Sequence, residues 1–295
     1  MTEMAAPRPL PALSPATILF VIGIIAVIVP TMMFVGRESW SQETGAHGPI
    51  VLFTGLWLLR RRWLAARPDM QPAPTLPVIL LTAVVLPLYL FSRVTQIVEI
   101  EGYLMYALVL ISLYSVVGFK AMKLMWFPLF YMLFVFPPPD TLIALITQPL
   151  KIFISQAAIG FLHFLGYPIG GAGVMIQIGQ YQLLVAAACS GLNSLVSLSA
   201  ISLFYIYVRH QANWRYALLL GFMIIPVAVI ANFIRVLILI LLTYHLGEAA
   251  AQSFLHDFAG ITMFLAAVLT IFAIDSILEP IWRRFNKTGT PSHDG

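Results

Sequence analysis

Long apolar runs, separated by short segments that hold most of the charges and many of the prolines and glycines, dominate this chain. A membrane-spanning helix needs about 20 mostly apolar residues, or slightly fewer where flanking charges reach the interface. By this measure we expect eight transmembrane helices, over residues 17–35, 48–59, 76–91, 103–117, 119–136, 190–208, 216–244 and 254–278. The seventh run is too long for one upright span, and Pro226 predicts a kink or break within it.

Two segments between the runs carry other patterns. Polar residues recur at roughly helical spacing along residues 140–165, at Thr141, Gln148, Lys151 and Ser155. This pattern predicts a helix lying in the outer interface, because a ninth span would put Lys151 near mid-membrane and move five downstream basic residues outside. Within residues 167–184, glycines and alternating apolar positions predict an external loop with a short extended piece.

The composition assigns the chain to the membrane. Of its 295 residues 60% are hydrophobic and 9% are charged, so a water-soluble core could not hide the apolar side chains beneath a polar surface. We therefore expect a single all-α, polytopic membrane domain over residues 1–295, with tails at 1–16 and 283–295. The net charge of +4 comes mostly from short basic clusters beside the runs, a pattern of membrane orientation and not of nucleic-acid binding.

Lysines and arginines set the predicted orientation. With a cytoplasmic N-terminus, most basic residues fall inside, only Arg37, Arg93 and Lys151 fall outside, and Arg235 lies within the membrane. The first run is followed by no small-x-small cleavage pattern, so we expect it to be retained as a helix. Both termini are then cytoplasmic.

The single cysteine, Cys189, stands at the outer start of the sixth run. One cysteine allows no internal disulfide and no multi-thiolate metal site, so Cys189 is either a small buried residue or a chemically reactive thiol. At a helix N-terminus, unpaired N–H groups favour the thiolate and can also stabilise an oxyanion. Ser190 and Gly191 follow directly and allow close approach of another backbone. We treat Cys189 as a candidate nucleophile.

Two further groups fall at a similar predicted depth in the next two runs. Arg235 lies inside a span, where a guanidinium is costly without a partner or a task, and Asn232 precedes it by one turn on the same face. Structural pairing of Arg235 with an external carboxylate is the alternative. His256, beside Asp257, opens the eighth run and is a candidate general base and acid. Together with Cys189 these groups predict acyl transfer through a thioester.

The other histidines do not lie beside a second candidate catalytic group. Among them we retain only His47, at the outer start of the second run, as a further candidate. The spacing of histidines and carboxylates does not predict a zinc site, and we expect no cofactor.

Three short motifs stand on successive runs: Ala-Cys-Ser-Gly-Leu at 188–192, Asn-Phe-Ile-Arg-Val at 232–236 and His-Asp-Phe-Ala-Gly at 256–260. Together they resemble the exosortase/archaeosortase family. His-Gly-Pro-Ile at 47–50 and the prolines at 137–139 add to the likeness, which extends from about His47 to Gly260. Ala187 and Asn193 depart from it, because many members carry glutamate and arginine at these positions.

The resemblance implies a polytopic cysteine transpeptidase of the bacterial inner membrane, with Cys189, Arg235 and His256 as its catalytic trio on the periplasmic side. It also implies a membrane-anchored protein substrate whose C-terminal sorting tail combines a Pro-Glu-Pro motif, a transmembrane helix and a basic cluster. Asn232, Asp257, Ser190 and Asn193 are the expected supporting residues. The alternatives are another thioester-using acyltransferase, or a transporter or polysaccharide- or lipid-handling protein in which Arg235 binds an anion.

Overall fold

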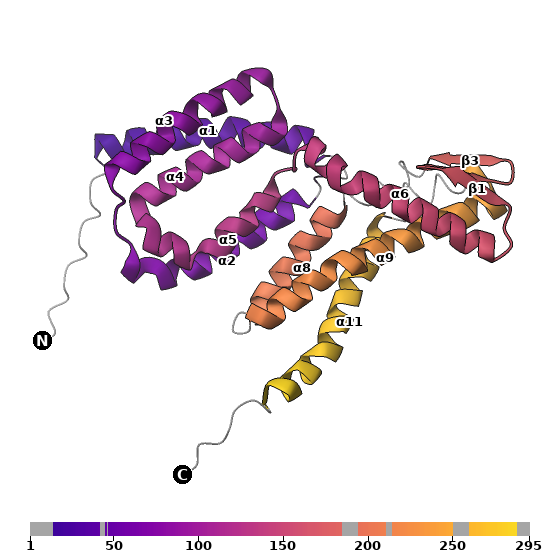
Figure 1. Cartoon of the computed structure of the whole chain (residues 1–295). Helices are drawn as coiled ribbons and strands as arrows, with labels where there is room; N and C mark the ends of the chain where they lie inside the picture. The colour runs from indigo at the N-terminus through magenta and orange to yellow at the C-terminus, as the bar shows by residue number, and fades with distance from the viewer. Residues whose placement is uncertain are drawn as a thin grey trace, which may run out of the picture. The chain divides into compact units, whose positions relative to one another are not determined.

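The apolar runs fold as long α-helices in the computed structural model, which describes residues 14–41, 45, 47–184, 194–210, 214–249 and 260–287 (Figure 1). Six of the described helices are long and apolar enough to cross a membrane: Pro15–Glu38, Thr75–Thr95, Val98–Leu124, Ile143–Phe164, Arg215–Leu246 and Leu265–Trp282. They expose large apolar side chains such as Leu19 and Phe164, as expected of helices that face lipid. The prediction of an all-α, multi-pass membrane protein is confirmed.

The chain divides into two compact units, Met1–Ser41 with Arg61–Trp126, and Gln42–Arg60 with Phe127–Gly295. In the first unit, α1 (Pro15–Glu38) begins where the hydroxyl of Ser14 accepts a hydrogen bond from the backbone N–H of Thr17 at 3.2 Å. Helix α4 (Val98–Leu124) packs against α1 and against α3 (Thr75–Thr95), and a short 3₁₀ turn, η1 (Arg67–Asp69), precedes α3.

Gly118 interrupts α4 with a left-handed backbone (φ 74°). Just before this break, the carbonyls of Val117 and Ser115 accept hydrogen bonds from the backbone N–H groups of Gln71 and Ala73 at 3.1 and 3.2 Å. A Cβ atom at residue 118 would lie 2.1 Å from the carbonyl oxygen of Gln71, so only glycine fits this close approach.

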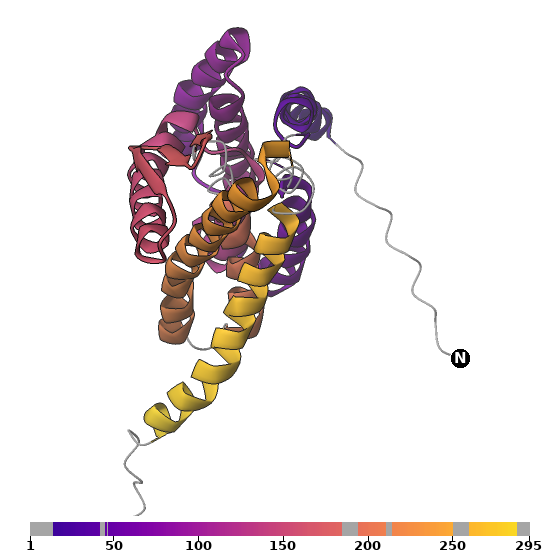
Figure 2. The same ribbon diagram turned by 90° about the vertical axis from the view of Figure 1, so that its right-hand side faces the viewer.

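In the second unit, three helices pack side by side: α8 (Ser194–His210), α9 (Trp214–Leu246) and α11 (Gly260–Lys287). Their shared apolar core includes Leu198, Leu220 and Ile271. Figure 2 shows α9 and α11 running alongside each other. Because consecutive helices of this trio run in opposite directions, the start of α8, the end of α9 and the start of α11 lie towards the same end.

A small sheet caps the region where α6 (Asp140–Phe164) meets α9. Strands β1 (Ile169–Ala172), β2 (Met175–Ile178) and β3 (Tyr181–Leu184) pair antiparallel in the order β1-β2-β3. Both connections are two-residue hairpin turns that open on a glycine with positive φ, Gly173 at 62° and Gly179 at 55°. The predicted extended piece in this segment is confirmed.

One apolar cluster joins α6, the sheet and α9. Its buried members are Ile154, Ala158, Leu162, Ile169, Ile176, Ile178, Val236 and Ile240. The segment predicted to lie in the interface is thus a helix packed on α9, and its residues 143–164 also meet the length and composition of a membrane span. Its interfacial placement stays a prediction.

Several predicted spans have different bounds in the structure. The fifth, residues 119–136, is not one helix: α4 continues to Leu124, and α5 (Trp126–Tyr131) and the 3₁₀ turn η2 (Met132–Val135) follow. The lysines at 120 and 123 do not end α4, because a helix can run past the membrane boundary. The second belongs to α2 (Gly48–Ala66), which continues through its three arginines and is not among the six candidate spans.

Candidate functional site

Arg235 lies in the second half of α9, in the part of the helix that packs against α6 and the sheet. Its side chain is 4% exposed, and that of Asn232, three residues earlier on the same helix face, is 5% exposed. Both residues take part in interactions within the protein. A buried guanidinium is expensive unless it is compensated. The catalytic role of Arg235 stays a prediction.

The remaining predicted site residues, Cys189, Ser190, Asn193, His256 and Asp257, lie outside the described residues. Their segments are bounded by described elements, however. Cys189 belongs to the stretch between β3 and α8, and His256 to the stretch between α9 and α11. Arg235 precedes the end of α9 by 11 residues, or about 16 Å of helix rise.

His47 lies in the turn before α2 and is buried against the beginning of α8. Its Nδ1 is 2.9 Å from the hydroxyl of Ser197, in the first turns of the helix that directly follows the Cys189 segment. Burial lowers the pKa of His47, and a hydrogen bond with the backbone of Phe134 partly opposes that shift. His47 is therefore a buried group with a lowered pKa, and it contacts the helix that follows the Cys189 segment in the chain.

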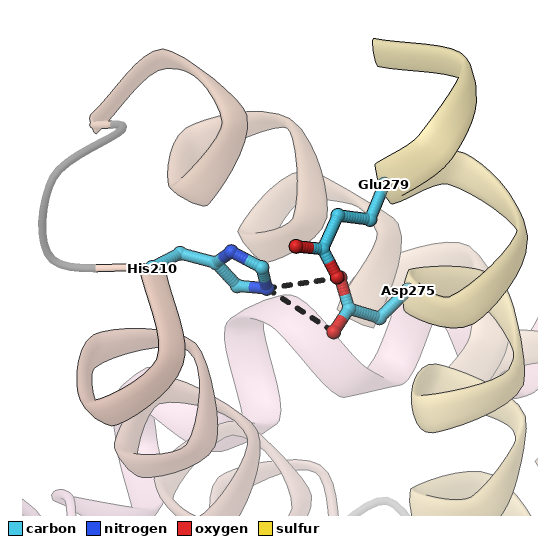
Figure 3. Close-up of side chains that lie close together, drawn as sticks. All are labelled: His210, Asp275 and Glu279. Atoms are coloured by element: carbon cyan, nitrogen blue, oxygen red, sulfur yellow. Dashed lines mark hydrogen bonds and ion pairs between the residues drawn. The ribbon is translucent and has the colours of Figure 1, made fainter. Parts of the chain in front are cut away.

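A second polar cluster lies at the other end of the helix trio. Figure 3 shows His210, at the end of α8, pointing toward Asp275 and Glu279 on α11. His210 Nε2 lies 2.9 and 3.1 Å from the two oxygens of Asp275. One potential ligand atom from each of the three residues lies within 4.8 Å of the others. The sequence spacing did not reveal this group.

The surrounding side chains already satisfy Asp275. Tyr205 donates to one carboxylate oxygen at 2.5 Å, and Tyr216 donates to the other at 2.8 Å. Arg209 lies 3.3 Å from Asp275 and 3.1 Å from Glu279 in two ion pairs. A metal ion here would meet a guanidinium at close range and would have to displace hydroxyl donors, so the residues present do not fit a cation site.

The cluster instead links α8, α9 and α11 through hydrogen bonds and ion pairs. One sequence signal could have found it, because Asp275 is a carboxylate within an apolar run, where an ionisable residue needs a partner. The partners are harder to find, because His210 is 65 residues away in the chain.

These features define a polytopic membrane protein with a buried arginine in one of its helices. A model of the transmembrane exosortase family matches residues 39–273, so the chain belongs to this family. The matched region contains Cys189, Arg235 and His256. No curated protein and no solved structure matches the chain.

Proposed function

We propose that the protein is a cysteine transpeptidase or protease that cleaves the C-terminal sorting tail of exported proteins at the outer face of the bacterial inner membrane. The observation that carries this proposal is the burial of Arg235 in α9, the helix that directly precedes the His256 segment in the chain. Membership of the exosortase family adds support, because a membrane transpeptidase role goes with that family.

The three side chains have complementary roles in the proposed reaction. His256 takes the thiol proton of Cys189, and the thiolate attacks a peptide carbonyl of the substrate. Arg235 stabilises the oxyanion that develops on the carbonyl oxygen, and the N–H groups at the start of the following helix can assist. When the tetrahedral intermediate collapses, His256 returns the proton to the departing amine and the substrate acyl group remains on sulfur as a thioester.

The second half of the reaction resolves this thioester. An acceptor amine or water attacks the thioester carbonyl, gives its proton to His256, and releases the thiolate of Cys189. Asp257 orients the imidazole in this scheme, and Asn232 holds the Arg235 side chain. Such an arrangement acts on a substrate whose own helix is docked beside the enzyme in the bilayer.

Processing of an exported reporter tests the proposal. The reporter ends in a Pro-Glu-Pro motif, an apolar helix and an arginine cluster, and is coexpressed with the full chain. We expect Cys189→Ala, His256→Ala and Arg235→Ala each to abolish trimming, and Arg235→Lys to retain little activity because a point charge replaces the planar donor fork. Arg215→Ala, an arginine at the exposed start of the same helix, is the matched control.

The competing functions make different predictions for the same variants. An anion transporter or lipid-handling protein needs Arg235 but no nucleophile, so its activity would survive Cys189→Ala. Trimming that persists in a stably folded Cys189→Ala variant therefore contradicts the proposal. An acyltransferase that uses Cys189 would leave the reporter uncleaved in every background, including the wild type, and would also contradict it.

A further inference from the structure

A polar cavity of about 350 Å³ lies in the first unit, where the ends of α1 and α3 meet the start of α4. This volume is within the range of small-molecule sites. Its lining combines three apolar residues, Pro30, Met33 and Phe34, with five charged or polar ones, Arg37, Glu38, Arg93, Gln96 and Glu101. None of these residues belongs to the proposed catalytic site, so the inference below is independent of the proposed function.

Glu101 is the most unusual member of this lining, because it is 0% exposed. Thr31 Oγ1 donates to its Oε1 at 2.7 Å, and Arg93 Nη1 donates to the same oxygen at 2.6 Å. The other oxygen, Oε2, is buried and has no hydrogen-bond partner among the described residues. A buried carboxylate oxygen without a donor is costly, and an N–H or O–H donor of a ligand would remove that cost.

The opposite charge is supplied by Arg37 and Arg93. Arg93 is partly exposed and stands over the ring of Phe34, 6.0 Å from its centroid, which helps to fix its position. Arg37 is exposed and makes no ion pair with another described residue. The orientation prediction leaves three basic residues on the outer side of the membrane, and two of them are Arg37 and Arg93. These two arginines line the same cavity.

The charges of the lining match a zwitterion. Two guanidinium groups and two carboxylates sum to zero, so a purely anionic or purely cationic ligand would leave one pair uncompensated. The cavity also lies at the ends of candidate membrane spans, and its lining includes Met33 and Phe34 of α1. The ends of a spanning helix are where lipid headgroups are expected.

We propose that this cavity binds the headgroup of a zwitterionic phospholipid that carries a primary amine, with its phosphate on Arg37 and Arg93 and its ammonium group on Glu101 and Glu38. A phosphate accepts hydrogen bonds from guanidinium groups, and the ammonium group donates to Glu101 Oε2. Phosphatidylcholine has the same charges but no N–H donor. The site therefore distinguishes ethanolamine from choline headgroups.

Equilibrium binding of short-chain phospholipids to the purified full chain in detergent tests the proposal. We expect the phosphatidylethanolamine form to bind about tenfold more tightly than the phosphatidylcholine form, the effect of one charge-assisted hydrogen bond. Arg37→Ala should weaken binding of the ethanolamine lipid about tenfold, and this exposed position carries little risk for folding. Glu101→Gln should reduce the preference for ethanolamine over choline to near unity. Arg67→Ala, an exposed arginine of the same unit outside the cavity, should change neither value.

Other outcomes would overturn the assignment. Equal affinity of the wild type for the two lipids, or unchanged affinity of Arg37→Ala for the ethanolamine lipid, would show that the cavity does not recognise the headgroup. Displacement of the lipid by equimolar inorganic phosphate would make it a site for a free anion. Displacement by an equimolar acidic peptide would make it a peptide site.

Discussion

The buried carboxylate of Asp275 should contribute strongly to the stability of the α8, α9 and α11 bundle. It is 1% exposed and accepts hydrogen bonds from Tyr205 at 2.5 Å, Tyr216 at 2.8 Å and His210 at 2.9 Å. An Asp275→Ala change removes the shared acceptor and leaves these donors without their partner in the interior. The variant therefore tests whether the cluster stabilises the packing of the three helices.

The expected loss of unfolding free energy follows from the number of buried hydrogen-bond donors that Asp275→Ala leaves without an acceptor. Each buried donor without a partner costs about 1–3 kcal/mol, and such costs do not add fully within one network. We expect Asp275→Ala to lower the free energy of unfolding by about 3–5 kcal/mol, in the range seen when one partner of a buried ion pair is removed. Asp275→Asn keeps a carbonyl acceptor of the same shape, so its loss should be about half as large.

Glu279→Gln is the matched control on the same helix, because the ion pair of Glu279 is with the largely exposed Arg209 and should contribute little. Denaturant unfolding of the full chain in one detergent, followed by far-ultraviolet circular dichroism, measures all three variants. A loss of less than about 1 kcal/mol for Asp275→Ala, or an equal loss for Glu279→Gln, would refute the reasoning.

Three further predictions concern separate features. Gly118→Ala should lower the free energy of unfolding by about 2 kcal/mol or more, because φ is 74° and the new Cβ would meet the Gln71 carbonyl. Gly23→Ala is the control and should be neutral or stabilising, because there is open space around Gly23. Equal effects of the two changes on unfolding would argue against the close approach at Gly118. Burial lowers the pKa of His47 below 6.5, so the unfolded chain binds a proton on this side chain more readily than the folded chain does. The free energy of unfolding should therefore fall as pH drops below about 6.5. The same pH dependence of stability in His47→Gln as in the wild type would contradict this prediction. Chelation of divalent metals should leave the unfolding midpoint unchanged, since the cluster at Asp275 is satisfied by protein donors, and a fall in the midpoint would reveal a metal there.

Hydropathy predicted the helices better than it predicted their ends. The run at 17–35 corresponds closely to α1, and the extended piece before residue 184 was recognised from its glycines and alternating apolar residues. The boundary expected after residue 117 coincides with the break at Gly118, yet α4 resumes beyond it because hydropathy marks the membrane edge and not the last helical hydrogen bond. Hydropathy alone does not indicate where a helix stops outside the lipid.

The candidate sites show a similar limit. Burial of Arg235 could be anticipated, because a guanidinium in an apolar run must be enclosed by protein. The contact of His47 with Ser197 spans 150 residues, and the cavity at Glu101 depends on three helix ends meeting. Such arrangements arise from tertiary packing, which the spacing of residues along one helix does not encode.

The central claim is that Cys189 carries the substrate acyl group as a thioester. Intact-protein and peptide mass spectrometry of the full chain, quenched in acid during turnover of the Pro-Glu-Pro reporter, tests it directly. The account predicts a mass increase on the Cys189 peptide that hydroxylamine removes, that is absent in Cys189→Ala and that forms more slowly in His256→Ala. Reporter cleavage without any adduct on Cys189, at equal rates in the wild type and Cys189→Ala, would contradict it.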